Sequence, residues 1–234
     1  MNRAPKLNRD AARLIVPRGG PINEALARTT HLGIGAHPDD LEIMTWHGIA
    51  HCYANEANWF SGVVVTTGAA GPRRDEETAT TDDRALVAQR LAEQTRAAEL
   101  GDYAALAYLG YESDDIKQPG VASVGEDLDT LLAAMRPDVV YTHSPFDTHA
   151  SHVAVLAHVV EAVRRLPAPD QPQALYGCEV WGGLDWLPER YKMRFDVSAR
   201  AALNTELVAL HASQVAGGKR YDLATLGRKQ AHAT

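Results

Sequence analysis

The segment from His31 to Glu42 constrains the fold more than any other part of the chain. It begins with an apolar run, Leu32 to Ala36, that is typical of a buried strand. One imidazole and three carboxylates follow within six positions, at His37, Asp39, Asp40 and Glu42. In an open α/β sheet, ligands bind beyond the carboxyl ends of the strands, so this position predicts a binding site. Because so many acids at one strand end need a cation or a catalytic task, we interpret the segment as half of a metal site.

Strand and helix patterns alternate along the rest of the chain. We expect helices over 41–54, 82–100, 124–135 and 153–165, and strands over 62–67, 105–109, 139–142, 174–180 and 193–197. A last helix, capped by Ser198, should reach about Ala212, whereas the tail from Val215 is weakly patterned. The alternation predicts an α/β fold, a Rossmann-like three-layer sandwich with a mostly parallel sheet. A dinucleotide fingerprint is missing, since His37-Pro-Asp-Asp stands where its glycine turn would be.

Length and composition indicate one globular unit. A chain of 234 residues with 45% hydrophobic residues can bury a core without disulfides. We divide it into an irregular N-terminal lead-in, residues 1–30, and a single domain, residues 31–234. No stretch reaches the roughly 18 apolar residues of a membrane span, so we expect a cytoplasmic protein. A formal net charge of -7 without a basic patch argues against a nucleic-acid partner, whereas homo-oligomerisation stays open.

A second polar cluster follows the strand expected at 139–142. It contains Asp147, His149 and His152, and it runs into a helix. His149 and His152 are three residues apart at the helix start, so both can face one point. Histidine and carboxylate ligands that leave one position for water are the usual zinc set of hydrolases. His37, Asp40 and one histidine of the second cluster can supply this set, which leaves one carboxylate and one imidazole for proton transfer.

The two clusters also carry a family resemblance. His37-Pro-Asp-Asp-Leu-Glu42 and Asp147-Thr-His-Ala-Ser-His152 resemble the two signature motifs of the PIG-L / LmbE-like family of zinc-dependent N-deacetylases. The resemblance covers about residues 30 to 214, because it extends through Thr67-Gly68, Arg90 to Glu93, Leu100-Gly101 and His211-Ala-Ser-Gln214. It implies the LmbE-like fold, and a small N-acyl amino sugar or glycoconjugate as substrate.

The resemblance also implies a role for each residue of the site. The metal ligands would be His37, Asp40 and His152, holding one zinc or another divalent ion per chain. Asp39 would be the general base, and His149 the positively charged or acid group near the oxyanion. The reaction would be removal of an N-acetyl or longer N-acyl group from an amino sugar by metal-activated water.

This chain departs from the family pattern in its second motif. Ala150 and Ser151 replace the usual middle pair, and we expect Asp147 to compensate by orienting His149. Arg74, in the long loop of residues 68–81, and Asp147 are our candidates for substrate binding. For Arg74, a solvated loop charge is the competing interpretation.

Several alternatives stay open at this point. The chain can be a catalytically weak sugar- or metal-binding domain on the same fold, or a metal hydrolase of another amide or ester. We expect Glu42 to orient its neighbours rather than react, and His47 and His51 to be ordinary histidines rather than a second metal site. A sugar-stacking wall competes with ordinary packing for three aromatic residues, Trp181, Trp186 and Tyr191.

Overall fold

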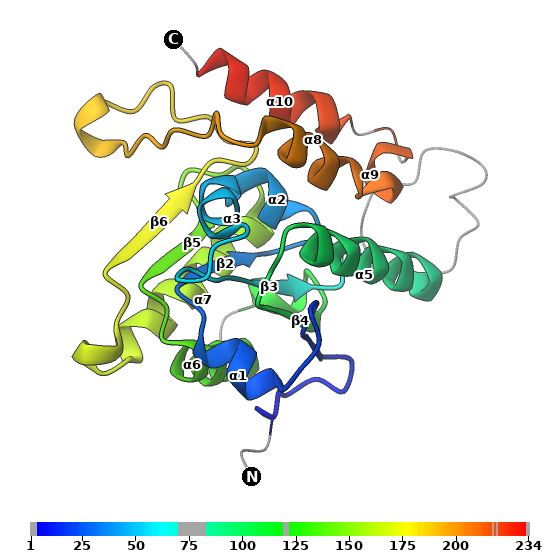
Figure 1. The fold of residues 1–234 in the computed structure, drawn as a ribbon, viewed down its shortest axis with the longest axis vertical. Coiled ribbons are helices and arrows are strands. Elements are labelled where there is room, and N and C mark those ends of the chain that lie inside the picture. The colour runs from blue at the N-terminus through cyan, green and yellow to red at the C-terminus, as the bar shows by residue number, and fades with distance from the viewer. Residues whose placement is uncertain (1–3, 70–82, 119–121, 217, 219, 233–234) are drawn as a thin grey trace.

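One six-stranded sheet organises the molecule. The structure is a computed structural model, which describes residues 4–69, 83–118, 122–216, 218 and 220–232 (Figure 1). Strands β1 to β6 are Arg13–Ile15, His31–Gly35, Phe60–Thr66, Ala105–Tyr111, Val139–His143 and Ala174–Cys178. Helices α1, α2, α3, α5 and α6 are Ile22–Ala27, Asp40–Met44, Trp46–Cys52, Asp83–Leu100 and Ala122–Met135. Helices α7 to α10 are Ala150–Arg165, Ala201–Ala209, Ala212–Ala216 and Tyr221–Ala231, and three 3-10 turns are Asp115–Lys117, Ala168–Asp170 and Glu189–Tyr191.

The strand order creates a crevice beside β2. The order is β1-β4-β3-β2-β5-β6, and every pair is parallel except β1 with β4. From β2 the chain first builds the sheet in one direction, through β3 and β4, and then returns to place β5 on the other side of β2. A ligand site is expected where the order reverses, beyond the carboxyl ends of β2 and β5. The two polar clusters of the sequence follow these two strands.

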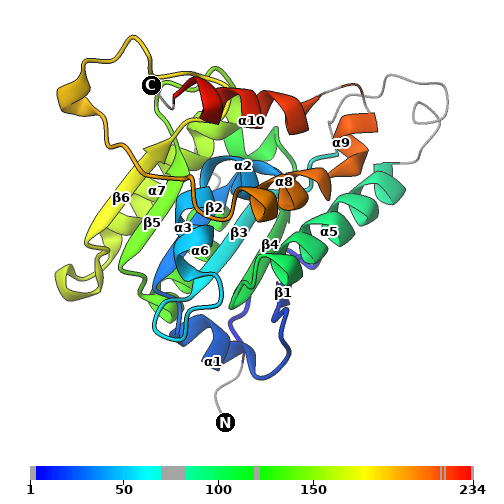
Figure 2. The ribbon, with the colours of Figure 1, turned by 45° about the horizontal axis from the view of Figure 1, so that its top comes forward.

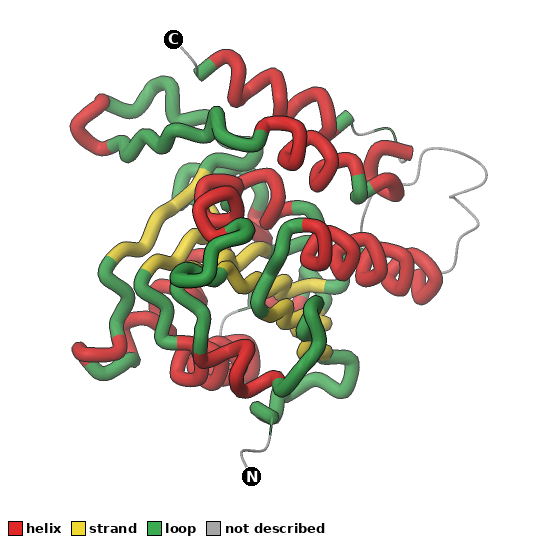
Figure 3. Tube along the Cα trace, in the orientation of Figure 1, coloured by secondary structure: helices red, strands yellow, loops and turns green. Residues whose placement is uncertain are grey.

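Helices cover both faces of the sheet, as the layers in Figure 3 show. On one face, α1, α6 and α7 pack against residues such as Ile34 and Val63. On the other face, α2, α3, α5 and α8 pack against Val64 and Leu106. Val63 and Val64 point to opposite faces because side chains alternate along a strand. The β-branched run of β3 is therefore buried on both sides, which is why it lacks an apolar-polar alternation.

The predicted fold class is confirmed. The parallel sheet between two helical layers is the expected three-layer α/β sandwich, and the core helices lie within three residues of their predicted positions. One expected helix, over 41–54, is instead two helices that meet at Thr45. The Thr45 Oγ1 hydroxyl donates to the Leu41 carbonyl at 2.7 Å, and its φ of -104° leaves the helical range.

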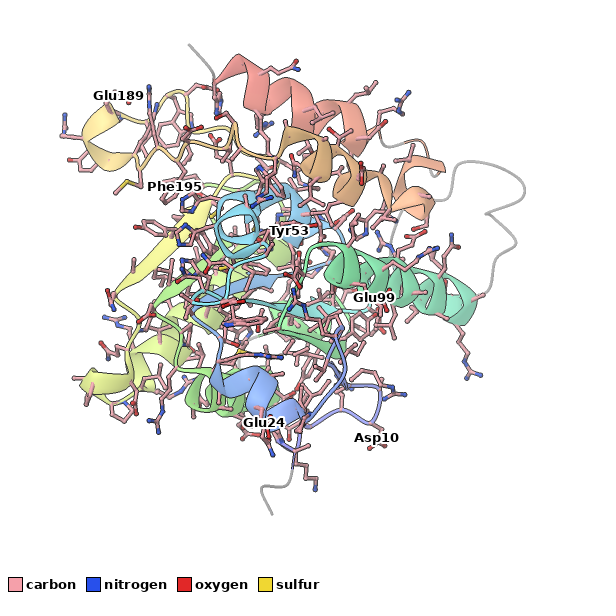
Figure 4. All side chains as sticks on the ribbon, viewed as in Figure 1. Asp10, Glu24, Tyr53, Glu99, Glu189 and Phe195 are labelled. Carbon is pink, nitrogen blue, oxygen red and sulfur yellow. The ribbon has the colours of Figure 1, made fainter. Side chains whose placement is uncertain are left out.

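The C-terminal part of the chain differs most from the predictions. The strand expected at 193–197 is absent, because residues 179–200 form an arm that extends beyond the sheet edge. In Figure 4, Glu189 lies at the outer end of this arm and Phe195 lies nearer the sheet. Ser198 bonds Asp196 and caps no helix, since α8 begins after Arg200. The weakly patterned tail contains α10, which lies at the edge where the parallel strands end (Figure 2).

The N-terminal lead-in is more regular than expected. It contains β1, which adds an antiparallel edge strand to β4, and the short helix α1, which packs on the core. Both elements are too short for periodicity to reveal them. Among the described residues, no helix combines the length and the apolar character needed to cross a membrane.

Candidate functional site

The first polar loop is shaped by close packing against β2. Gly35 lies so near α2 that an added Cβ would stand 2.9 Å from the Cβ of Asp40, so only glycine permits this approach. The Asp40 carboxylate turns back and accepts the backbone N–H of His37 through Oδ2, at 2.7 Å. Asp39 adopts a φ of +101°, which is strained for any residue other than glycine. The loop therefore holds three polar side chains in one fixed, partly strained arrangement.

The second loop presents His152 from the first turn of α7. Asp147 accepts the backbone N–H of His149 through Oδ1 at 2.8 Å, while its Oδ2 lies 3.0 Å from Nδ1 of His152. Asp147 thus orients the ring of His152, not that of His149 as expected from the sequence. A carboxylate behind a histidine fixes the tautomer and directs the other ring nitrogen forward, as behind metal-ligating histidines. Here Nε2 of His152 faces the first loop.

The structure brings His37, Asp40 and His152 together. Nδ1 of His37 lies 3.3 Å from Oδ2 of Asp40, and Nε2 of His152 lies 3.5 Å from Oδ1 of Asp40. The two histidine nitrogens are 3.2 Å apart. A tetrahedral zinc ion with bonds of about 2.1 Å separates its ligands by about 3.4 Å. The two histidine nitrogens have about this spacing, and each has a different oxygen of Asp40 beside it, so the chemistry of the donor set fits a divalent cation.

Two further histidines flank these three residues. Nitrogen and oxygen atoms of His37, His149 and His152 converge within metal-binding range, as do those of Asp40, His143 and His152. The sequence indicated at most a supporting role for His143, which directly follows a strand. Its Nε2 accepts the backbone N–H of Ala36 at 2.9 Å, so this lone pair is already engaged. His143 instead stacks on His152, with ring centroids 3.9 Å apart, and its place at the end of β5 was the only sequence signal for it.

The two neighbouring aspartates have opposite electrostatic properties. Burial and the adjacent Asp40 together raise the pKa of Asp39 to about 6. Burial also raises the pKa of Asp40, but His152 and His143 outweigh this effect and hold it well below its usual range. Asp40 is therefore the permanent anion of the site. Asp39 is a carboxylate whose proton affinity suits exchange near neutral pH.

The pKa values of His149 and His152 are also shifted in opposite directions. Burial disfavours a charge on His152, but Asp40 and Asp147 outweigh this effect and raise its pKa. Burial, His37 and His152 together lower the pKa of His149 to about 4. At neutral pH this favours a neutral His149 imidazole, which can still donate one hydrogen bond. The family resemblance implied a positively charged or acid group at this position, and the lowered pKa disfavours the positive charge.

A cavity of about 420 Å³ opens in front of these residues. Asp39 is only 5% exposed, yet it lines this cavity together with His37 and His149. Trp181 also lines it and packs against Tyr221 of α10 in a tilted arrangement, with ring centroids 4.5 Å apart. The cavity therefore has a polar floor and an aromatic side, as in sites for small polar organic ligands.

Two of the three aromatic residues considered as a sugar-stacking wall do not line the cavity. Trp186 packs on the exposed Phe146, and Tyr191 is 64% exposed on the arm. Arg90 donates to the Gly68 carbonyl at the cavity wall. Glu93 on the same helix accepts the backbone N–H and the hydroxyl of Ser213. The prediction for Arg74 falls outside the described residues.

Both polar loops lie in the part of the chain that matches a known protein family. The model of the family PIG-L, GlcNAc-PI de-N-acetylase, matches residues 32–163, which include both polar loops. In a search of curated proteins nothing matches.

Solved structures share the fold. The N,N'-diacetylchitobiose deacetylase from Pyrococcus horikoshii has a TM-score of 0.63 at 22% identity, over 80% of this chain and 70% of that chain. The A40926 pseudoaglycone deacetylase Dbv21 has a TM-score of 0.62 at 17% identity, over 88% and 92%. GalB, the 4-carboxy-2-hydroxymuconate hydratase from Pseudomonas putida KT2440, has a TM-score of 0.58 at 16% identity, over 86% and 85%. At these identities the likeness shows the fold alone, on which at least two kinds of reaction are found.

Proposed function

The chain belongs to the PIG-L family, and from this membership we propose that it is a metal-dependent hydrolase that removes an N-acyl group from an amino sugar. The observation that carries the proposal is the convergence of His37, Asp40 and His152 at 3.2 to 3.5 Å, with Asp39 beside them. The deacetylases among the structural relatives support the same class of reaction.

His37, Asp40 and His152 are the residues that would hold the metal. A divalent ion bound there would lower the pKa of a water molecule and polarise the acyl carbonyl of the substrate. Asp147 keeps His152 directed toward this position, through the contact between its Oδ2 and the ring Nδ1. Zinc is our first candidate, and the donor set also suits other divalent ions.

Asp39 and His149 would carry the proton chemistry. Asp39 accepts a proton from water as the water oxygen attacks the acyl carbonyl, and it returns this proton to the amine nitrogen when the C–N bond breaks. His149 donates a hydrogen bond to the oxygen that becomes negative during the attack. The products are a carboxylate and a free amino sugar.

A catalytically silent binding domain explains the site less well. Binding a metal or a sugar requires ligands, but it does not require a second, strained carboxylate beside them. Asp39 is such a group, because it is held at a φ of +101° and lies at the cavity floor. The aromatic pair of Trp181 and Tyr221 supports a substrate with a ring that can stack.

Activity and metal content measured on one preparation test the proposal. We expect about one divalent ion per chain by elemental analysis, and release of acetate and free amine from N-acetylglucosamine glycosides. Matched acetyl esters serve as the comparison substrates. Absence of bound metal, also after dialysis against zinc, would refute the metal-dependent mechanism. Faster hydrolysis of the esters than of the N-acyl sugars would favour the alternative of a different metal hydrolase.

A further inference from the structure

We infer that Gln94 is a positioning residue, whose side chain holds the backbone of Asp39 in its catalytic conformation. The inference rests on the proposed function, since it assigns Asp39 to catalysis. Gln94 lies on α5, 55 positions from Asp39, and its Oε1 accepts the Asp39 backbone N–H at 3.1 Å. This bond reaches the one residue of the first loop that has a positive φ.

The other end of Gln94 is fixed as firmly. Its Nε2 donates to Oε1 of Glu42 at 2.9 Å, and the same oxygen accepts the hydroxyl of Tyr103 at 2.7 Å. The second oxygen of Glu42 lies 3.0 Å from Nε2 of His211. Glu42 therefore has three side-chain partners, which matches its expected role of orienting its neighbours.

All the groups of this network are buried. Gln94, Glu42 and Tyr103 are 0% exposed, and His211 is 3% exposed. Buried hydrogen bonds without competing water define the geometry of their partners, and each unmet group costs more than it would at the surface. His211 follows α8, so the C-terminal part of the chain supports a loop that lies 169 positions earlier.

The position requires an amide. The Asp39 N–H needs an acceptor, and the Glu42 carboxylate needs a donor, at the two ends of one neutral side chain. Glutamine offers both. If its amide were flipped, its NH₂ group would face the Asp39 N–H and its oxygen would face the Glu42 carboxylate. Gln94 can thus bond its two partners in only one orientation. We expect this to fix the Asp39 peptide, and through it the direction of the carboxylate.

Gln94→Met tests the inference, because it keeps the volume and removes both hydrogen bonds. Loss of a supporting partner of this kind lowers activity by about 10 to 100-fold. We expect this loss in kcat, with KM and the bound metal per chain unchanged. We also expect faster hydrogen exchange of the Asp39 amide, a readout that does not depend on activity.

Tyr103→Phe is the matched control. It removes one hydrogen bond to the same Glu42 oxygen at an equally buried position, but it does not contact Asp39. We expect it to lower the melting temperature as Gln94→Met does, with kcat within about twofold of the parent. Equal losses of kcat in the two variants would overturn the inference, because the network would then act through general stability.

Gln94→Glu provides a rescue that a merely structural role would not produce. The new carboxyl group keeps an acceptor for the Asp39 N–H, and when protonated it also donates to Glu42. Relative to the parent at each pH, we expect kcat within about threefold at pH 6, and a decline toward the Gln94→Met value at pH 8. An equal deficit at both pH values would contradict the inference.

The two proposals fail in different ways. A parent protein that cleaves none of the N-acyl sugars would refute the proposed function. The position of Asp39 would then still be tested by its amide exchange, and an unchanged rate in Gln94→Met would overturn the inference. An active parent with an equally active Gln94→Met variant would overturn the inference and leave the proposed function intact.

Discussion

Two clusters of three histidines lie at opposite ends of the same strand, β2. The carboxyl-end cluster consists of His37, His149 and His152, and the amino-end cluster of His31, His47 and His51. In the carboxyl-end cluster the ring nitrogens converge, and those of His37 and His152 lie beside Asp40. In the amino-end cluster the rings pack against each other. His31 and His51 have centroids 4.9 Å apart, and His47 and His51 are stacked at 6.1 Å.

The partners of the amino-end cluster are aromatic and neutral. His47 stacks on Phe195 of the arm at 4.1 Å, and its Nδ1 lies 2.8 Å from the hydroxyl of Tyr141. Burial and the neighbouring His51 and His47 together lower the pKa of His31 to about 4. Burial and His51 also lower the pKa of His47, so both His31 and His47 favour the neutral form in this packed cluster.

The difference between the clusters lies in the carboxylates, since both contain histidines. Asp40 stands between His37 and His152, and Asp147 stands behind His152. At the amino end only Asp138 acts on His31, and its influence is smaller than that of burial and of the other two histidines. A histidine cluster becomes a cation site when carboxylates both share the cation and orient the rings.

Replacing one histidine in each cluster should separate the two most sharply. We expect His152→Ala to lose nearly all of about one metal ion per chain, and with it the activity, because it removes a ligand with its orienting contact. His51→Ala should keep the metal and the activity. Elemental analysis of both variants, purified side by side, is the measurement. Equal metal loss from both would show that the amino-end cluster binds metal, and would end the distinction.

The next largest effect should come from Asp39, which lies beside the carboxyl-end cluster and is not one of the proposed metal ligands. Asp39→Asn removes the proton acceptor and keeps the size of the side chain. General acid–base groups contribute about 10² to 10⁴-fold. We expect a loss of kcat in this range with unchanged metal content. Asp114→Asn, at the cavity rim, is the control and should stay close to the parent. Loss of metal from Asp39→Asn would instead make Asp39 a ligand.

The sequence predicted that His37, Asp40 and His152 lie together, for a physical reason. His37, Asp40 and His152 follow two strands that have clear apolar runs, and the ends of parallel strands meet at one edge. Local pattern therefore determines a long-range contact. The sequence pattern did not predict which histidine ring Asp147 contacts. The rotation of the first turn of α7 decides between His149 and His152.

The sequence pattern did not predict the contacts that Glu42 and Asp39 make with distant helices. His211 pairs with Glu42 across 169 positions, and Gln94 reaches Asp39 across 55. Neither contact leaves a local period in the sequence, because each depends on how whole helices dock. The prediction of a strand at 193–197 was wrong for a similar reason. Its apolar residue Phe195 packs on His47 and Tyr176, although the backbone is not part of the sheet.

Lowering the pH should reduce the free energy of unfolding through the amino-end cluster. A folded-state pKa of about 4 for His31 means that the unfolded chain binds more protons between about pH 6.5 and pH 4. The free energy of unfolding should thus fall by up to about 3 kcal/mol as the pH decreases through this window, and be unaffected above it. Urea unfolding of the parent and of His31→Gln, at pH 7.5, 6 and 5, isolates this contribution by difference. Parallel pH profiles for the two proteins would contradict it.

The smallest effect should come from the groups that orient one histidine in each cluster. Asp147→Asn keeps the shape but leaves an amide that cannot accept from both the His149 N–H and Nδ1 of His152. We expect metal affinity to fall by about 10 to 100-fold.

Tyr141→Phe removes the corresponding partner of His47 and should cost about 1 kcal/mol of stability, with metal affinity unchanged. Competition with a zinc chelator and urea unfolding measure the two quantities. Weaker metal binding in Tyr141→Phe would show that the two ends of β2 are coupled, whereas unchanged binding in Asp147→Asn would mean that Asp147 acts on the substrate, as its sequence motif also allowed.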